Sequence, residues 1–333
     1  MTPAAALLAD EIHRDGPLPF RRFMEVALYH PEHGYYRRPR DPFGAAGDFF
    51  TAEQIQPVFG ILIAARIRQL FRAMGEPPDF TVVELGAGRG EMAEAFSEWR
   101  YVPVDLDRGE LPARFAGIVF CNEFFDALPV DVAVYRGGQF LEQRVAFDGE
   151  RFLWRTGEPL AEEAAASLQR YWASPEEGRW YEASPKVPFW LARIANALES
   201  GYLFTIDYGF TRAESIRFPA GTLMGYRRHS AHDDVLLDPG ARDITAHVNF
   251  TALQEAGAAR GLRTERFETL AQTLLAAGEA DQFGAAIGNA GPADELRRRM
   301  QLKTLLFGMG ETFRVLLQRR EREEEIGGKS PKQ

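Results

Sequence analysis

The stretch FTVVELGAGRGEM at residues 80–92 constrains the fold more than any other part of the chain. Its β-branched first half is typical of a buried strand, its glycines allow a tight turn, and residues 91–99 have a helical pattern. Two further apolar runs, at 101–106 and 117–123, predict the next strands. Strands that alternate with glycine turns and helices predict a parallel sheet that binds its ligand beyond the carboxyl ends of the strands.

The remaining patterns predict additions to this α/β core. Residues 55–74 have the spacing of an amphipathic helix, residues 131–156 alternate as antiparallel hairpins do, and residues 201–209 form another buried strand. Further helices are expected at 159–172, 186–199, 249–260, 269–277, 293–306 and 311–325. We predict a helical and loop cover at 1–75, the core at 76–130 and 200–325, an inserted β-ribbon with helices at 131–199, and a flexible tail at 326–333.

Charge and cysteine content limit the classes of ligand and compartment. The chain has 39 basic and 48 acidic residues, a net charge of −9, which argues against a general nucleic-acid binder and suits a cationic ligand. One cysteine, Cys121, excludes an internal disulfide and favours a reducing compartment. The N-terminus lacks the pattern of a signal peptide, and no stretch has the length of a membrane span, so we expect a cytoplasmic protein without stable membrane insertion.

The glycine turn carries a carboxylate that dinucleotide sites do not need. The spacing is Gly86-x-Gly88-x-Gly90, whereas dehydrogenases use G-x-G-x-x-G, and Glu84 precedes it on the strand. A carboxylate there attracts a cation such as S-adenosylmethionine, and Asp105 after the next strand is placed to accept hydrogen bonds from ribose hydroxyls. The alternative is a tight turn that happens to be flanked by two surface acids.

Several stretches together resemble the MidA-type class I methyltransferases. They are MEVALYHPEHGYY (24–36), GDFFTA (47–52), VELGAGRGEM (83–92), NEFFDALPV (122–130), IDYG (206–209), DITAHVNF (243–250) and GMGETFRVL (308–316). The family includes a mitochondrial assembly factor that methylates an arginine of a respiratory complex I subunit. The resemblance implies a Rossmann-like methyltransferase core, S-adenosylmethionine as cofactor, and a protein substrate that presents arginine, with a respiratory-complex subunit as one option. The cofactor-binding residues it points to, together with the reasoning above, are Thr51, Glu84, Gly86, Ala87, Gly88, Gly90, Asp105 and Asn122.

Glu123 and Asp126 are the candidates for catalysis. Glu123 follows a strand of the parallel sheet, so its carboxylate is expected to face the methyl donor. A guanidinium keeps its charge and is held flat by carboxylates, so Glu123 and Asp126 are suited to orient an acceptor arginine, while Phe124 and Phe125 exclude water. The alternative is that both acids cap a helix that begins at Phe124 and that the phenylalanines fill the core.

Other functions remain open at this point. A non-catalytic assembly factor is the competing hypothesis, because only LDRGELPARFA separates Asp105 from GIVF, where the family carries a further strand and helix. A nicotinamide oxidoreductase is disfavoured by the glycine spacing and by Glu84. The pairs His30 with His33 and His229 with His232 lack an evident third ligand, so no metal site is expected.

Overall fold

The computed structural model describes residues 1–38, 52–227, 230–288 and 291–322. The chain folds into two compact units. One comprises residues 51–125, 188–209 and 253–333 and is called here the parallel-sheet unit. The other comprises residues 1–50, 126–187 and 210–252 and is called the antiparallel unit.

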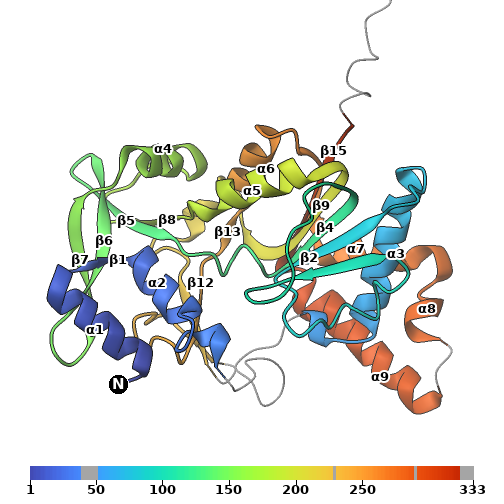
Figure 1. Cartoon of the computed structure of the whole chain (residues 1–333), viewed down its shortest axis with the longest axis horizontal. Coiled ribbons are helices and arrows are strands. Elements are labelled where there is room, and N and C mark those ends of the chain that lie inside the picture. The colour runs from blue at the N-terminus through green and yellow to red at the C-terminus, as the bar shows by residue number, and fades with distance from the viewer. Residues whose placement is uncertain (39–51, 228–229, 289–290, 323–333) are drawn as a thin grey trace, which may run out of the picture. The chain divides into compact units, whose positions relative to one another are not determined.

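The parallel-sheet unit is built on one twisted sheet with the strand order β14-β15-β9-β4-β2-β3 (Figure 1). Strands β2 (Thr81–Leu85), β3 (Arg100–Val104), β4 (Phe115–Asn122) and β9 (Leu198–Phe210) run parallel. Strands β15 (Phe313–Arg320) and β14 (Arg263–Thr269) complete the sheet in antiparallel orientation. The predicted Rossmann-like core is therefore confirmed, with β9 and β4 at the centre of the sheet.

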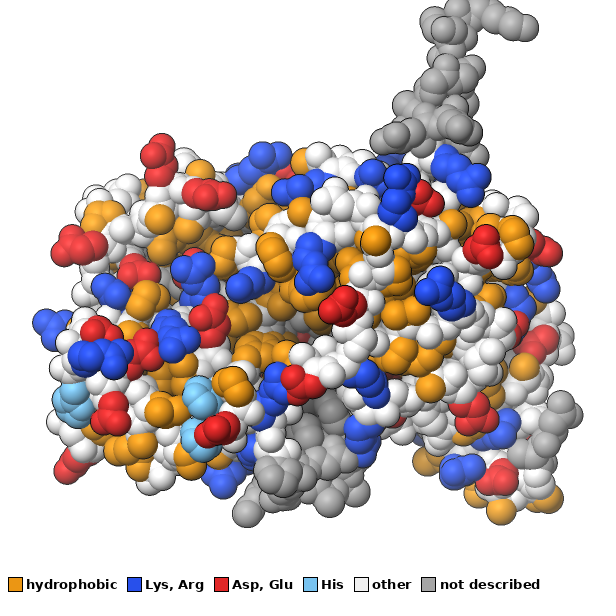
Figure 2. Space-filling view, viewed as in Figure 1, with side chains coloured by type: hydrophobic (Ala, Val, Ile, Leu, Met, Phe, Trp, Pro, Cys, Tyr) orange, Lys and Arg blue, Asp and Glu red, His pale blue; other side chains and the backbone are white. Residues whose placement is uncertain are grey.

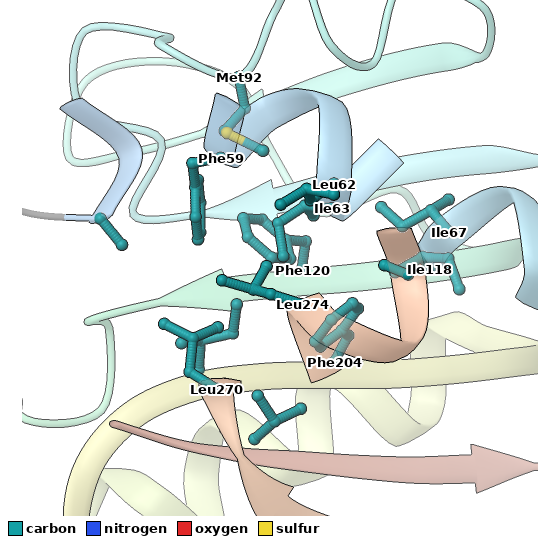
Figure 3. Packing of buried hydrophobic residues seen from close by; sticks show 14 of the residues in the cluster. Phe59, Leu62, Ile63, Ile67, Met92, Ile118, Phe120, Phe204, Leu270 and Leu274 are labelled. Atoms are coloured by element: carbon teal, nitrogen blue, oxygen red, sulfur yellow. The ribbon is translucent and has the colours of Figure 1, made fainter. Parts of the chain in front are cut away.

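Helices of this unit bury their apolar residues on the sheet. Helix α3 (Val58–Ala73) lies beside α7 (Leu270–Gly278), and Figure 3 shows Phe59 and Ile63 packing towards Phe120, Leu274 and the strands below. Fully burying each such side chain stabilises the fold by roughly 1.5–3 kcal/mol. The remaining helices are α5 (Lys186–Ala197), α6 (Phe250–Ala258), α8 (Gly284–Ile287) and α9 (Pro292–Lys303). Helix α3, which the sequence places in the cover, thus packs on the core sheet.

Two predicted helices are wrong. Residues 311–325 were expected to be helical, but residues 313–320 form β15, which pairs with β9 on one side and β14 on the other. A central strand is buried on both faces, so its apolar residues do not alternate and resemble a buried helix. Residues 91–98 form successive turns held mainly by i to i+3 hydrogen bonds, with Met92 and Phe96 as the buried anchors. No helix N-terminus therefore follows the glycine turn within residues 91–98.

The antiparallel unit contains two small sheets. The first has the order β1-β6-β5-β8, and β7 also pairs with β6. Its strands are β1 (Leu18–Pro19), β5 (Asp131–Arg136), β6 (Gln139–Phe147), β7 (Phe152–Pro159) and β8 (Trp180–Ala183). The predicted hairpins are thereby confirmed. The second sheet joins β10 (Met224–Arg227), β11 (Ser230–His232) and β12 (Asp243–Thr245). Helices α1 (Pro3–Asp15) and α2 (Phe20–Tyr29) pack on these strands, α4 (Glu162–Tyr171) flanks β8, and β13 (Val248–Asn249) precedes α6.

The surface in Figure 2 intersperses basic and acidic side chains, so that face carries no broad field of one charge. None of the helices in the described ranges combines the length and the apolar character needed to cross a bilayer. The predicted tail at 326–333 lies outside the described residues.

Glu182 on β8 is a buried carboxyl group of the antiparallel unit. Its oxygens accept hydrogen bonds from Thr222 N at 2.8 Å and from Thr222 Oγ1 at 3.3 Å. Burial is the main influence on this group and raises the pKa of Glu182 to about 7, against the hydrogen bonds, which lower it. The folded protein therefore holds the Glu182 proton at a pH where the unfolded chain releases it.

We expect this raised pKa to make the protein less stable as the pH rises. A carboxyl group with a higher pKa in the folded state lowers the free energy of unfolding progressively between pH 4.5 and pH 7, by about 3 kcal/mol in all. Glu182→Gln should remove this part of the fall in the free energy of unfolding, because glutamine does not titrate. Any destabilisation by the amide itself is the same at every pH. Urea unfolding at pH 5 and pH 8 measures this fall, with Glu158→Gln on the exposed side of β7 as the control. An equal decline in the parent and in Glu182→Gln would contradict the assignment.

Candidate functional site

The glycine turn lies at the carboxyl end of β2. The φ angles of Gly86, Gly88 and Gly90 are +75°, +48° and +86°, a region that glycine enters without the clash of a Cβ atom. The backbone N–H groups of Gly86 and Ala87 donate to Val104 O of β3 at 2.9 and 3.3 Å. These hydrogen bonds hold the turn against β3, at the carboxyl end of the parallel strands.

Asp105 closes the turn from the end of β3. Its Oδ2 accepts from Gly88 N at 2.7 Å, and its Oδ1 accepts from Leu106 N at 2.6 Å. The Arg108 guanidinium donates to the carbonyl oxygens of Ala87 and Gly88 at 3.3 and 3.2 Å. Asp105 is thus placed beside the turn, as expected, and it organises the turn's backbone; a bond to ribose hydroxyls stays a prediction.

Glu84 and Glu53 form a buried pair of carboxyl groups. Glu84 lies on β2, and Glu53 lies in a short 3-10 helix at Ala52–Gln54; both are buried. The Tyr101 hydroxyl donates to Glu84 Oε2. Burial raises the pKa of Glu84 to about 7, against the lowering effect of Tyr101, and burial together with Glu84 raises the pKa of Glu53 well above its usual range. Two carboxyl groups in such surroundings do not both ionise readily.

Sequence reasoning missed Glu53. It follows the GDFFTA stretch directly, but nothing in the local pattern distinguishes it from a surface acid, and its partner on β2 is distant in sequence. Thr51, the predicted cofactor contact just before it, lies outside the described residues.

Asn122 and Glu123 emerge where β4 ends. The φ angle of Glu123 is +51°, which is uncommon for a residue with a side chain, and its N–H donates to Ile206 O of β9 at 2.9 Å. Asn122 Nδ2 donates to Glu123 Oε1 at 3.2 Å, and Phe125 N donates to Asp207 Oδ2 at 3.1 Å. The structure therefore holds the Glu123 carboxylate in a defined direction beyond the carboxyl end of β4, as a binding or reacting group requires.

The segment after Glu123 contains no helix, within the described residues 122–130. The alternative in which Glu123 and Asp126 cap a helix beginning at Phe124 is therefore wrong. Phe124 instead faces the glycine turn, because a Cβ atom on Gly86 would lie 3.2 Å from Phe124 Cδ2. Its ring also meets Trp190 of α5 edge to face, with centroids 5.2 Å apart.

Asp126 belongs to the antiparallel unit, whereas Glu123 belongs to the parallel-sheet unit. Asp126 O accepts from Ala246 N at 2.9 Å, and its carboxylate lies near Asp243 of β12. Asp243 Oδ1 accepts from the Tyr36 hydroxyl at 2.9 Å. Burial and, next, Asp126 raise the pKa of Asp243 to about 7, against the bond from Tyr36. The structure thus brings together residues from three of the seven stretches, and Asp243 is an acid that sequence reasoning did not single out.

The histidines do not assemble into a metal centre in the described part of the chain, which has no group of three or more His, Cys, Asp or Glu side chains placed to hold an ion. The rings of His30 and His33 stack with centroids 5.1 Å apart. His229 lies outside the described residues. Burial lowers the pKa of His247 to about 4, so it is neutral at physiological pH. Asn249 Oδ1 accepts from Ala252 N at 3.1 Å and thereby caps the start of α6.

The residues at the ends of β2 and β4 fit S-adenosylmethionine. Its sulfonium and ammonium groups are cations, and Glu84, Glu53 and Glu123 gather there as acids. Glu84 Oε1 and Asn122 Oδ1 are buried, and within the described residues they accept no hydrogen bond other than the one that Glu84 shares with Glu53. The glycine turn offers a backbone that a ligand can approach closely. Buried acceptors beside such a turn suit the charged end of this cofactor.

Comparison with known proteins agrees with this geometry. A family of S-adenosyl-L-methionine-dependent methyltransferases matches residues 93–268. A protein of Burkholderia thailandensis, solved with bound S-adenosyl-homocysteine, is 31% identical, has a TM-score of 0.84, and aligns over 95% of this chain and 91% of its own. The mitochondrial protein arginine methyltransferase NDUFAF7 homolog of Drosophila melanogaster is 27% identical over 77% of this chain and 70% of its own length. The human NDUFAF7 protein is 26% identical over 76% and 68%.

These relatives overturn one expectation. A cytoplasmic location was predicted, but the Drosophila, mouse and human relatives are all named as mitochondrial proteins. A single cysteine favours any reducing compartment, so composition did not distinguish the two locations.

The family match, together with the Burkholderia structure that holds the demethylated cofactor, settles the class of this protein. The chain belongs to a family of S-adenosylmethionine-dependent methyltransferases.

Proposed function

We propose that this methyltransferase acts on an arginine side chain of a partner protein. The observation that carries the proposal is the Glu123 carboxylate, held at the end of β4 by Asn122 Nδ2 and by the backbone bond to Ile206 O. Curated relatives named as protein arginine methyltransferases support it. The MidA-type resemblance adds a respiratory-complex subunit as the partner to try first.

The proposed roles follow from the charge of each group. Glu84, Asn122 and the backbone of the glycine turn hold the cofactor, with Asp105 organising that turn. When bound, S-adenosylmethionine supplies an electrophilic methyl group. Glu123 orients the acceptor guanidinium through charge-assisted hydrogen bonds. Because methyl transfer depends on alignment, Glu123 contributes mainly by positioning the acceptor nitrogen.

Calorimetric titration with S-adenosylhomocysteine tests the cofactor site first. We expect the parent protein to bind S-adenosylhomocysteine and Gly88→Val to bind it at least about thirtyfold more weakly. A β-branched residue cannot readily adopt the φ of +48° that Gly88 has in the glycine turn. Gly137→Val is the matched control, since Gly137 has a φ of +57° in a hairpin with open space around it.

A non-catalytic assembly factor is the competing function. One observation favours it: both carboxylate oxygens of Asp105, expected to bind ribose, accept backbone N–H groups. If the folded parent binds no S-adenosylhomocysteine, this second function replaces the first. Binding followed by cofactor-dependent methylation of an arginine in a partner would exclude it.

A further inference from the structure

Glu53 is a buried acid at this end of the sheet to which neither the sequence motifs nor the comparisons assign a role. It is 7% exposed, shares a side-chain hydrogen bond with Glu84, and lies close enough to Glu123 and Glu91 to be influenced by their charges. Glu84 in turn faces Glu91 and Arg108 and accepts from the Tyr101 hydroxyl. Glu91 is partly exposed and is paired with Arg89 at 2.8 Å. Among the described residues, acids therefore outnumber bases in the groups that act electrostatically on the inner pair, Glu53 and Glu84.

Such a pair resists double ionisation. Taking two carboxylates out of water costs several kcal/mol per ion, and their mutual repulsion adds to that cost, so paired buried acids retain a proton. The direction of the pKa shifts, upward for both Glu53 and Glu84, agrees with this reasoning. A cation that enters beside the pair takes over the role of that proton and allows both groups to ionise.

The two forms of the cofactor differ in this charge. S-adenosylmethionine carries a positive sulfonium, whereas S-adenosylhomocysteine has a neutral thioether at the same place. The α-amino and carboxylate groups are common to both. A site that exchanges a proton for a cation therefore responds to the methyl donor and not to the product.

We propose that Glu53 and Glu84 form a proton-sharing carboxyl pair that recognises the sulfonium: the pair holds one proton while no sulfonium is bound and releases it to solvent when the methyl donor binds. The inference deepens the methyltransferase function and depends on it. The charges balance, since one positive charge enters and one leaves. After methyl transfer the thioether of the product is neutral, so the pair takes up a proton again. The site then has no charge preference for the bound S-adenosylhomocysteine. Glu53 is thus a specificity residue that distinguishes donor from product.

A second observation points to a ligand at this place. Asn122 Oδ1 is buried without a hydrogen-bond partner among the described residues, and Asn122 is 5% exposed, whereas Glu84 shares a side-chain hydrogen bond with Glu53. Asn122 also donates to Glu123, which faces Glu53. Buried acceptors normally have partners, so the unpartnered Asn122 oxygen beside this acidic cluster indicates a missing donor or cation.

The test compares two ligands on the unmodified protein. Calorimetric titrations with S-adenosylmethionine and S-adenosylhomocysteine, each in two buffers of different ionisation enthalpy at pH 6.5, count the protons released on binding. We expect the donor to release about one proton more than the product. Between pH 5 and pH 7 the ratio of donor affinity to product affinity should rise by up to about tenfold per pH unit and then level off. Both ligands keep the same α-amino charge over this range.

Glu53→Gln tests whether the extra proton release comes from the Glu53–Glu84 pair or from another acid nearby. It should bind S-adenosylhomocysteine but lose the extra proton release, while Glu91→Gln, which neutralises an acid outside the pair, should keep it. Equal proton counts for donor and product on the parent would overturn the inference and leave the methyltransferase function intact. Retention of the difference in Glu53→Gln would overturn the role of Glu53. Failure of the folded parent to bind either ligand would instead reject the cofactor site.

Discussion

Replacing Glu123 with glutamine should lower kcat/KM for methyl transfer to arginine by about 10³-fold, while S-adenosylhomocysteine affinity changes less than about threefold. The substitution keeps the size of the side chain and its contact with Asn122 but removes the negative charge that orients the guanidinium. Losing one partner of a desolvated charge pair costs about 2–5 kcal/mol, and about 4 kcal/mol corresponds to this change in rate.

The measurement is incorporation of labelled methyl groups from S-adenosylmethionine into arginine-containing peptides and candidate partner proteins. Glu91→Gln is the control, because it neutralises an acid of the same cluster that pairs with Arg89 at the surface. If Glu123→Gln loses cofactor affinity in proportion to rate, Glu123 belongs to the cofactor site and the proposed role at the acceptor is wrong.

Replacing Gly117 with alanine should destabilise the protein by about 4 kcal/mol or more, enough to leave it largely insoluble. Gly117 opens the buried part of β4 with a φ of +151°, and an added Cβ atom would lie 1.9 Å from Thr81 O of β2. Gly201 on β9 repeats the arrangement, since its Cβ atom would lie 1.9 Å from Gly117 O. The obstacle at both positions is backbone of a neighbouring strand, which cannot move without breaking ladder hydrogen bonds.

Urea unfolding checks this prediction, and the yield of soluble protein serves where a variant does not fold. Gly137→Ala is the matched control: its φ is +57°, nothing lies within 4 Å of the added atom, and the expected loss is about 1 kcal/mol. Gly201→Ala should resemble Gly117→Ala. If both sheet variants lose no more than the hairpin control, the parallel strands are not packed as closely as the structure shows.

The sequence alone was sufficient to predict those structural features that depend on residues close together in the chain. A β-branched run followed by glycines specifies a strand and a tight turn through the preferences of those residues alone, and this pattern correctly placed Glu84 and Glu123 at strand ends. The alternation of residues 131–156 predicted the hairpins for the same reason, because a strand with one solvated face alternates. The methyl donor followed from a carboxylate beside the turn, a feature that lies within seven residues of sequence.

Long-range pairing decided the rest. Residues 313–320 became a strand because β9 and β14 flank them on both sides, although a run buried on two faces has no period that separates it from a helix. Glu53 lies near Glu84, and Asp126 near Asp243, because the fold brings together residues that are distant in sequence. No local sequence pattern encodes these contacts. Composition likewise gave no reason to expect the three carboxyl groups whose pKa rises to about 7, Glu84, Glu182 and Asp243, because burial is set by the packed fold. Propensity acts on neighbours in sequence, whereas desolvation and charge pairing act on neighbours in space.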